Sequence, residues 1–99
     1  MPSKTRRASR NVFDDLGFSQ EEAEHLRIRS ELMIELRKFI KSRGLTQTQA
    51  AKLLGVTQPR ISDLIRGKID RFSIDTLIEM LGNAGASVRI SVRPARRVA

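Results

Sequence analysis

One stretch, residues 45–68 with the sequence LTQTQAAKLLGVTQPRISDLIRGK, limits the possible folds of this 99-residue chain more than any other. Thr46 stands where a helix N-cap belongs, and Gln49, three residues later, can complete a capping box. The apolar residues that follow at helical spacing are Ala50, Leu53 and Leu54. Gly55 comes directly after them, where a chain leaving a helix often needs a positive φ. The pattern predicts a short helix that ends in a glycine turn.

A second short helix is predicted immediately after this turn. Thr57 can cap it, Pro59 falls in its first turn where a missing N–H costs nothing, and Gly67 ends it. Its apolar face consists of Ile61, Leu64 and Ile65. Two short helices joined by a glycine turn form the helix-turn-helix plan, in which the second helix enters the major groove of DNA.

The second helix carries polar residues that face outward once its apolar face is buried. The candidates for contacts with DNA bases are Gln58, Pro59, Arg60, Ser62 and Asp63. Gln58 can bind adenine, Arg60 can bind guanine, and Pro59 can lie against a thymine methyl group. Asp63 has two interpretations: it accepts a hydrogen bond from cytosine, or it pairs with Arg60 or Arg66.

Other residues of the stretch are suited to the DNA backbone. Gln47 lies at the N-terminus of the first helix, where the helix dipole favours a phosphate. The further candidates for phosphate contacts are Lys52, Arg66 and Lys68. Such contacts determine position and affinity rather than sequence preference.

The net charge of +8 is unevenly distributed along the chain. Residues 37–68 hold eight bases and one acid, whereas residues 13–36 hold seven acids and two bases. The segments 1–12 and 87–99 each carry four bases and no acid, and residues 69–86 have a net charge of −2. The positive block inside the domain coincides with the helix-turn-helix, as phosphate contact requires.

The flanking regions indicate an all-α domain with four to five helices. We expect a flexible basic arm over 1–12, a helix-turn-helix domain over 13–86, and a strand with a basic tail over 87–99. A small apolar cluster, Val12, Phe13, Leu16 and Phe18, precedes a capping box formed by Ser19 and Glu22. Residues 19–43 form one long helix or two, with an apolar stripe made of Leu32, Met33, Leu36, Phe39 and Ile40.

A later helix, starting at Ser73 or Asp75, contributes Ile74, Leu77, Ile78 and Leu81 to the core, and Phe72 anchors the loop before it. In the C-terminal sequence SVRISVR, Val88, Ile90 and Val92 alternate with polar residues, which is typical of a strand with one apolar face. No second strong strand is present in the sequence, so this strand needs a partner. Its partner can be residues 11–13, another protein or, as we favour, the same strand of a second subunit.

Composition argues against several other classes of protein. The chain has no cysteine, so disulfides and thiolate metal sites are impossible, and a reducing cytoplasm is the simplest location. No secretory signal or membrane-spanning stretch is found in the sequence. His25 is the single histidine and lies in an acidic helix, so we predict no catalytic residues, no metal site and no cofactor.

Residues 32–85, through TQTQAAKLLGVTQPRISDLIRGK and FSIDTLIEMLGNAG, resemble the DNA-binding domain of the Cro and phage-repressor (XRE) class. The resemblance implies that Gln47 contacts phosphate and braces Gln58, and that Arg66 faces the backbone. It also implies that the bases are faced by Gln58, Pro59, Ser62 and Asp63. The chain departs from the class pattern at Pro59 and Arg60, where small or amide residues are frequent.

Nearly the whole chain, through VFDDLGFSQEEAEHLRIRSELM, QPRISDLIRGK and VRISVRP, resembles the HigA-type antitoxins. This implies a dimer that binds double-stranded operator DNA, represses its own operon and neutralises a small basic HigB/RelE-like toxin. The acidic front segment, with Ile28 off the apolar stripe, offers a surface for such a toxin. The alternatives are a solitary XRE-type regulator and a protein-interaction module that has lost DNA binding.

Overall fold

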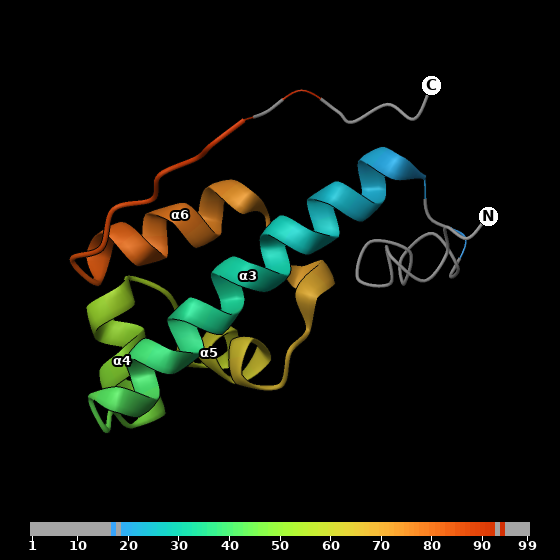
Figure 1. Ribbon diagram of the computed structural model, residues 1–99. Helices are drawn as coiled ribbons and strands as arrows, with labels where there is room; N and C mark the ends of the chain where they lie inside the picture. Colours follow the sequence, from blue (N-terminus) through green and yellow to red (C-terminus); the bar gives the residue numbers. More distant parts are fainter. Residues whose placement is uncertain (1–16, 18, 93, 95–99) are drawn as a thin grey trace.

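The computed structural model describes residue 17, residues 19–92 and residue 94, and this part of the chain is all-α. Its elements are α3 (Gln20–Ser42), α4 (Gln47–Leu54), α5 (Gln58–Ile65), the 3-10 helix η1 (Ile69–Arg71) and α6 (Ile74–Asn83). The long helix α3 contacts α6, α5 and η1, while α4 contacts both α5 and α6 (Figure 1). The predicted all-α helix-turn-helix architecture is therefore confirmed.

The first described helix, α3, is continuous over 23 residues, so residues 19–43 contain one helix rather than two. The predicted capping box begins it: the Ser19 hydroxyl accepts the Glu22 N–H at 3.1 Å, and the Glu22 carboxylate accepts the Ser19 N–H at 3.0 Å. At a rise of 1.5 Å per residue the helix is about 34 Å long, so its two ends belong to different parts of the protein surface. Neither α3 nor any other helix of the described residues is long and apolar enough to cross a membrane.

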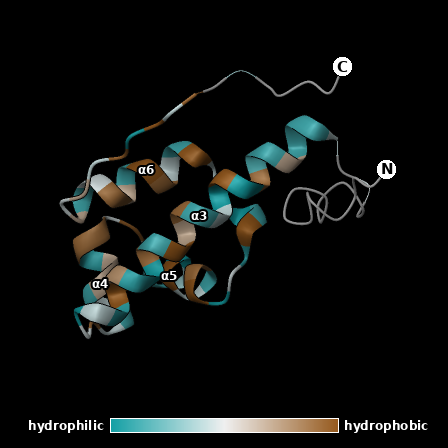
Figure 2. Cartoon of the chain, in the orientation of Figure 1, coloured by the Kyte–Doolittle hydropathy of each residue, from teal (hydrophilic) through white to brown (hydrophobic). Residues whose placement is uncertain are grey.

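One hydrophobic core joins the four α-helices of the described residues. Its buried residues are Met33, Leu36, Ile40, Ala50, Ala51, Leu54, Ile61, Leu64, Phe72, Leu77, Met80 and Leu81. Each helix shows alternating hydrophobic and hydrophilic bands, as expected when one face is buried (Figure 2). Two residues of the predicted α3 stripe, Leu32 and Phe39, are only half-buried at the edge of this core.

The segment between α5 and α6 is held in the core by Phe72, which is 2% exposed, as predicted. Ser73 is the N-cap of α6, and its hydroxyl accepts the Thr76 N–H at 3.1 Å. Of the four predicted core residues of α6, Leu77 and Leu81 are buried, while Ile74 and Ile78 are half-buried. The half-buried pair lines a groove together with the C-terminal segment.

Residues 86–92 form neither a helix nor a strand, which differs from the predicted C-terminal strand. The described residues contain no second extended segment with which this one could pair, and a strand cannot satisfy its own backbone groups. Val88 packs against the core cluster, whereas Ile90 is 68% and Val92 89% exposed. The segment runs back past α6 (Figure 1). Together with α3 and α6 it forms a groove, whose lining includes Ile28 and Val88.

Some predictions concern residues outside the described part of the chain. These are the basic arm over residues 1–12, the apolar cluster formed by Val12, Phe13, Leu16 and Phe18, and residues 11–13 as a partner for the C-terminal strand. Of the strand and basic tail predicted over 87–99, residues 93 and 95–99 also lie outside the described part.

Candidate nucleic-acid interface

The turn between α4 and α5 sets the position of the second helix. Gly55 has φ +73° and ψ +32°, in the left-handed region, and its N–H donates to the Ala51 carbonyl. The Asn83 side-chain amide, from α6, donates to the Leu54 carbonyl at 3.0 Å. The predicted glycine turn is therefore confirmed. The hydrogen bond from Asn83 also connects this turn to α6.

The beginnings of both helices are capped as the sequence predicts. Thr46 and Gln49 form a reciprocal capping box before α4, with N–H···O distances of 3.1 and 2.9 Å. Thr57 caps α5 through its hydroxyl, which accepts the Arg60 N–H at 3.4 Å, and Pro59 lies in the first turn. The first-turn N–H groups that the caps do not use, together with the positive end of the helix dipole, are suited to phosphate.

A hydrogen bond between side chains joins the N-termini of α4 and α5. The Thr48 hydroxyl donates to the Gln58 side-chain oxygen at 3.4 Å, although the residues are ten positions apart. The family resemblance implied that Gln47 would brace Gln58, but the bracing contact in the structure comes from Thr48. Gln47 itself is exposed at the start of α4.

The outward face of α5 is polar because Ile61 and Leu64 are fully buried on its other side. Gln58 and Pro59 are exposed, while Ser62, one turn after Gln58, is half-buried. The structure thus brings together three of the five candidates for base contact at the beginning of the second helix.

The other two candidates, Arg60 and Asp63, turn toward η1. The Arg60 guanidinium donates to the Arg71 carbonyl at 2.8 Å and lies 5.5 Å from the centroid of the Phe72 ring. Asp63 forms an ion pair with Arg71 at 3.3 Å, so the predicted pairing of Asp63 exists but its predicted partners, Arg60 and Arg66, are wrong. These contacts could not be predicted from helical spacing within α5, because η1 lies outside that helix and approaches it only in the folded protein.

The candidates for phosphate contact, Gln47, Lys52, Arg66 and Lys68, are distributed around this face. The first three are exposed and Lys68 is half-buried in the loop after α5. Sequence interpretation missed two further bases of α3, Arg37 and Lys41, which are exposed and have no acidic partner within the described residues.

These two α3 bases border the helix-turn-helix. Together with Ile65 at the end of α5 they line one shallow surface depression, and Arg37 reaches to within 3.8 Å of the place where a β-carbon on Gly67 would lie. Two signals in the sequence could have indicated Arg37 and Lys41 as candidates for phosphate contact. Both lie inside the positive block 37–68, and a spacing of four residues places them on the same face of a helix.

Comparison with known proteins agrees with this geometry. A model of the family described as "Helix-turn-helix domain" matches residues 12–93. The chain belongs to this helix-turn-helix family. A solved structure named "Putative XRE Family Transcriptional Regulator" is 31% identical, with a TM-score of 0.71, and the match covers 79% of this chain and 91% of that one. No curated protein sequence matches the chain significantly. The helix-turn-helix protein is therefore an XRE-type DNA-binding regulator, a class that is typically non-enzymatic.

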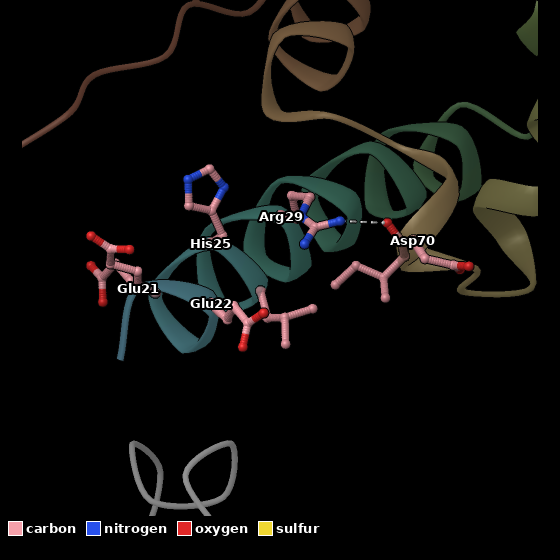
Figure 3. Close-up of a pocket in the computed structure, with 8 residues that line it drawn as sticks. Glu21, Glu22, His25, Arg29 and Asp70 are labelled. Atoms are coloured by element: carbon pink, nitrogen blue, oxygen red, sulfur yellow. Dashed lines mark hydrogen bonds between the residues drawn. The ribbon is translucent and has the colours of Figure 1, made fainter. Parts of the chain in front are cut away.

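The helix-turn-helix protein has an acidic surface at the other end of α3. A pocket there is lined by Glu21, Glu22, Glu24, His25, Leu26, Arg29, Ile69 and Asp70. Arg29 extends from α3 toward η1, while His25 and Glu21 point away from it (Figure 3). Among the described residues, no three acidic, histidine or cysteine side chains are grouped in a way that could hold a metal ion.

An ion-pair network lies on the exposed side of the same end of α3. Arg27 contacts Glu24 at 2.7 Å and Glu31 at 2.9 Å. The hydrogen bond from Arg27, and then its positive charge, lower the pKa of the Glu24 carboxyl. Because this network holds two carboxylates and one guanidinium, it keeps a net negative charge at this end of the helix.

Proposed function

We propose that this protein is a dimeric repressor that reads an operator with α5, and that it is the antitoxin of a toxin–antitoxin pair. The observation that carries the first part is the pair of adjoining, capped N-termini of α4 and α5, with an exposed polar face in a segment of net charge +7. Such a face combines base recognition with phosphate contact.

In this proposal, base contacts come from the beginning of α5 and phosphate contacts surround it. Gln58 contacts adenine through its amide, Pro59 contacts a thymine methyl group, and Ser62 contacts a base edge one turn later. The phosphates are contacted by Gln47, Lys52, Arg66 and Lys68. The exposure of these side chains supports the assignment for all but Ser62 and Lys68, which are half-buried.

The dimer is proposed to form through the C-terminal segment. Ile90 and Val92 are largely exposed in the single chain, although they alternate with polar residues in the manner of a strand. Pairing with the same segment of a second chain would satisfy the backbone and cover both side chains. Two subunits would then present two α5 helices to two half-sites of a palindromic operator.

A reporter gene under the DNA upstream of this protein's own gene tests the repressor. We expect repression by the wild-type protein and its loss in the double variant Gln58→Ala/Ser62→Ala. Glu79→Gln, an exposed change on α6, is the matched control and should repress normally. Repression that survives the double variant would contradict base reading by α5, and a wild-type protein that does not repress would contradict the repressor itself.

The antitoxin role is supported by charge complementarity. The acidic pocket at the start of α3 offers the carboxylates of Glu21, Glu22 and Asp70 to a basic protein, with Leu26 and Ile69 as apolar surface beside them. This end of α3 is far from α4 along a helix of about 34 Å. A toxin bound there would leave the DNA-binding face free, so one protein could bind the toxin and the operator together.

Expression of a neighbouring gene for a small basic protein, with and without this chain, tests the antitoxin role. We expect growth arrest by the neighbour alone and relief by the wild-type chain, with weaker relief by the charge-reversal variant Glu21→Lys/Asp70→Lys. The Gln58→Ala variant is the control and should relieve arrest normally. Arrest that the wild-type chain does not relieve, or the absence of such a neighbouring gene, would refute this role and favour a solitary regulator.

A further inference from the structure

The position of Arg60 conflicts with a role in reading bases. A base-reading arginine extends from the recognition helix with its donors directed into the groove. The Arg60 guanidinium is instead directed to the Arg71 carbonyl at 2.8 Å and lies over the ring of Phe72, which is almost fully buried. Both partners belong to the segment that connects α5 to α6.

A second arginine holds the same segment from the opposite helix. Arg29 of α3 donates to the Ile69 carbonyl at 3.2 Å and to the Phe72 carbonyl at 3.4 Å. Figure 3 shows this side chain extending from α3 to η1. The carbonyl groups of three of the four residues 69–72 are therefore occupied by guanidinium groups, two by Arg29 and one by Arg60. Arg29 comes from α3 and Arg60 comes from α5. Their hydrogen bonds to residues 69–72 therefore connect the long helix to the recognition helix through this segment.

The nearby acid of α5 is held by the same segment. The Asp63 carboxylate is 17% exposed and pairs with Arg71 at 3.3 Å. An unpaired carboxylate on the outer face of α5 would repel the DNA phosphates. The ion pair neutralises this charge and turns it toward η1, which leaves Gln58, Pro59 and Ser62 as the polar part of the reading face.

We propose that Arg60 is a positioning residue that fixes α5 against η1, and that base reading is carried by Gln58, Pro59 and Ser62. This inference rests on the proposed repressor function, because it concerns which side chains of the same surface discriminate between operators. It assigns the sequence preference of the protein to the first turn and a half of α5.

The test compares Arg60→Gln and Arg60→Lys with the wild-type chain, using its operator and the complete set of single-base variants of that operator. For Arg60→Gln we expect affinity to fall about 2- to 10-fold, the scale of one hydrogen bond, and by the same factor on every sequence. The preference at each operator position should be unchanged. Arg60→Lys should recover part of the affinity, since its ammonium can still donate to the Arg71 carbonyl and lie over the Phe72 ring.

Two further measurements separate positioning from general loss of structure. Amide hydrogen exchange should become faster in Arg60→Gln at residues 69–72 and remain unchanged in α6 and the C-terminal half of α3. Gln58→Ala is the comparison variant, and it should lose discrimination at one operator position by ~5- to 150-fold, with normal exchange. If Arg60→Gln unfolds the chain, Arg60→Lys still gives the full profile of base preferences.

The outcomes distinguish this inference from the proposed function. Loss of preference at a single base pair in either Arg60 variant, with unchanged hydrogen exchange, would overturn the positioning role and assign Arg60 to guanine reading. A wild-type protein that binds its operator and random DNA equally would instead overturn the proposed function.

Discussion

The glycine turn between α4 and α5 gives a sharp test of how the recognition helix is held. In Gly55→Ala, the new β-carbon would lie 2.9 Å from the side-chain nitrogen of Asn83, and the residue would have to keep φ +73°. Gly44→Ala is a matched control, because Gly44 has φ +60° but no atom within 4 Å of the new β-carbon. The two variants therefore share backbone strain and differ in the approach to Asn83.

The expected difference between these variants follows from that close approach. A left-handed backbone conformation destabilises the folded state of a non-glycine residue by ~1–2 kcal/mol. Replacing glycine also restricts the unfolded chain, which offsets this cost by ~0.4–1 kcal/mol. We expect Gly44→Ala to lower the free energy of unfolding by this net amount, about 1 kcal/mol. Gly55→Ala must also displace Asn83 from the Leu54 carbonyl, and breaking this hydrogen bond adds about 1 kcal/mol.

Urea unfolding followed by circular dichroism measures both changes, and thermal melting provides a second measurement. The additional effect of about 1 kcal/mol corresponds to a further fall in Tm of roughly 4–8 °C for a domain of this size. In an Asn83→Ala background, Gly55→Ala should cost no more than Gly44→Ala. Equal effects of the two glycine variants in the wild-type background would refute the idea that α6 supports the turn through Asn83.

Three further predictions concern other surfaces. The double variant Arg37→Gln/Lys41→Gln should flatten the slope of log affinity for DNA against log salt by ~0.9 for each phosphate that is no longer neutralised. Arg27→Gln is its control, since Arg27 pairs with Glu24 and Glu31 toward the other end of α3, and an equal flattening there would contradict specific binding of phosphate by Arg37 and Lys41. Ile90→Asp should shift the sedimentation profile from dimer to monomer while leaving the helical signal unchanged; an unshifted profile would refute pairing through the C-terminal segment. The lowered pKa of Glu24 means that its ion pair stabilises the folded protein above the ordinary glutamate pKa and loses this effect as pH falls through the lowered pKa. Glu24→Gln should remove that part of the acid-unfolding curve, and an unchanged curve would contradict the pairing.

The helices of this protein could be predicted from the sequence because their signals are local. Ser19, Thr46, Thr57 and Ser73 each cap the helix that follows them, and each lies within three residues of its hydrogen-bond partner. Gly55 ends α4 with the expected positive φ. Caps, glycine and apolar spacing all act within one helical turn, so the sequence alone reveals them.

The side-chain orientations at the candidate site could not be predicted in the same way. Arg60 and Asp63 are polar and lie on the outer half of α5, which suits base contact, but both turn toward η1. Thr48, rather than Gln47, donates the hydrogen bond to Gln58. These hydrogen bonds join residues 8 to 11 positions apart across turns, so they depend on tertiary packing.

The C-terminal segment differed from its prediction for a further physical reason. Alternation at Val88, Ile90 and Val92 indicates that one face of the segment is apolar, but a strand exists only when another strand completes its hydrogen bonds. In the single chain Val88 packs against the core and the other two side chains remain exposed. A strand at this position therefore requires a further extended segment to pair with, and the described residues do not contain one.

Titration of the full-length protein onto DNA from upstream of its own gene, and onto random DNA of the same length, tests the central claim most directly. Across a series of salt concentrations, we expect two chains bound per operator, tighter binding to the operator than to random DNA, and a steep fall of affinity with salt on both. Equal affinity for the two DNAs, or binding that does not depend on salt, would contradict the claim that this protein recognises an operator through its helix-turn-helix.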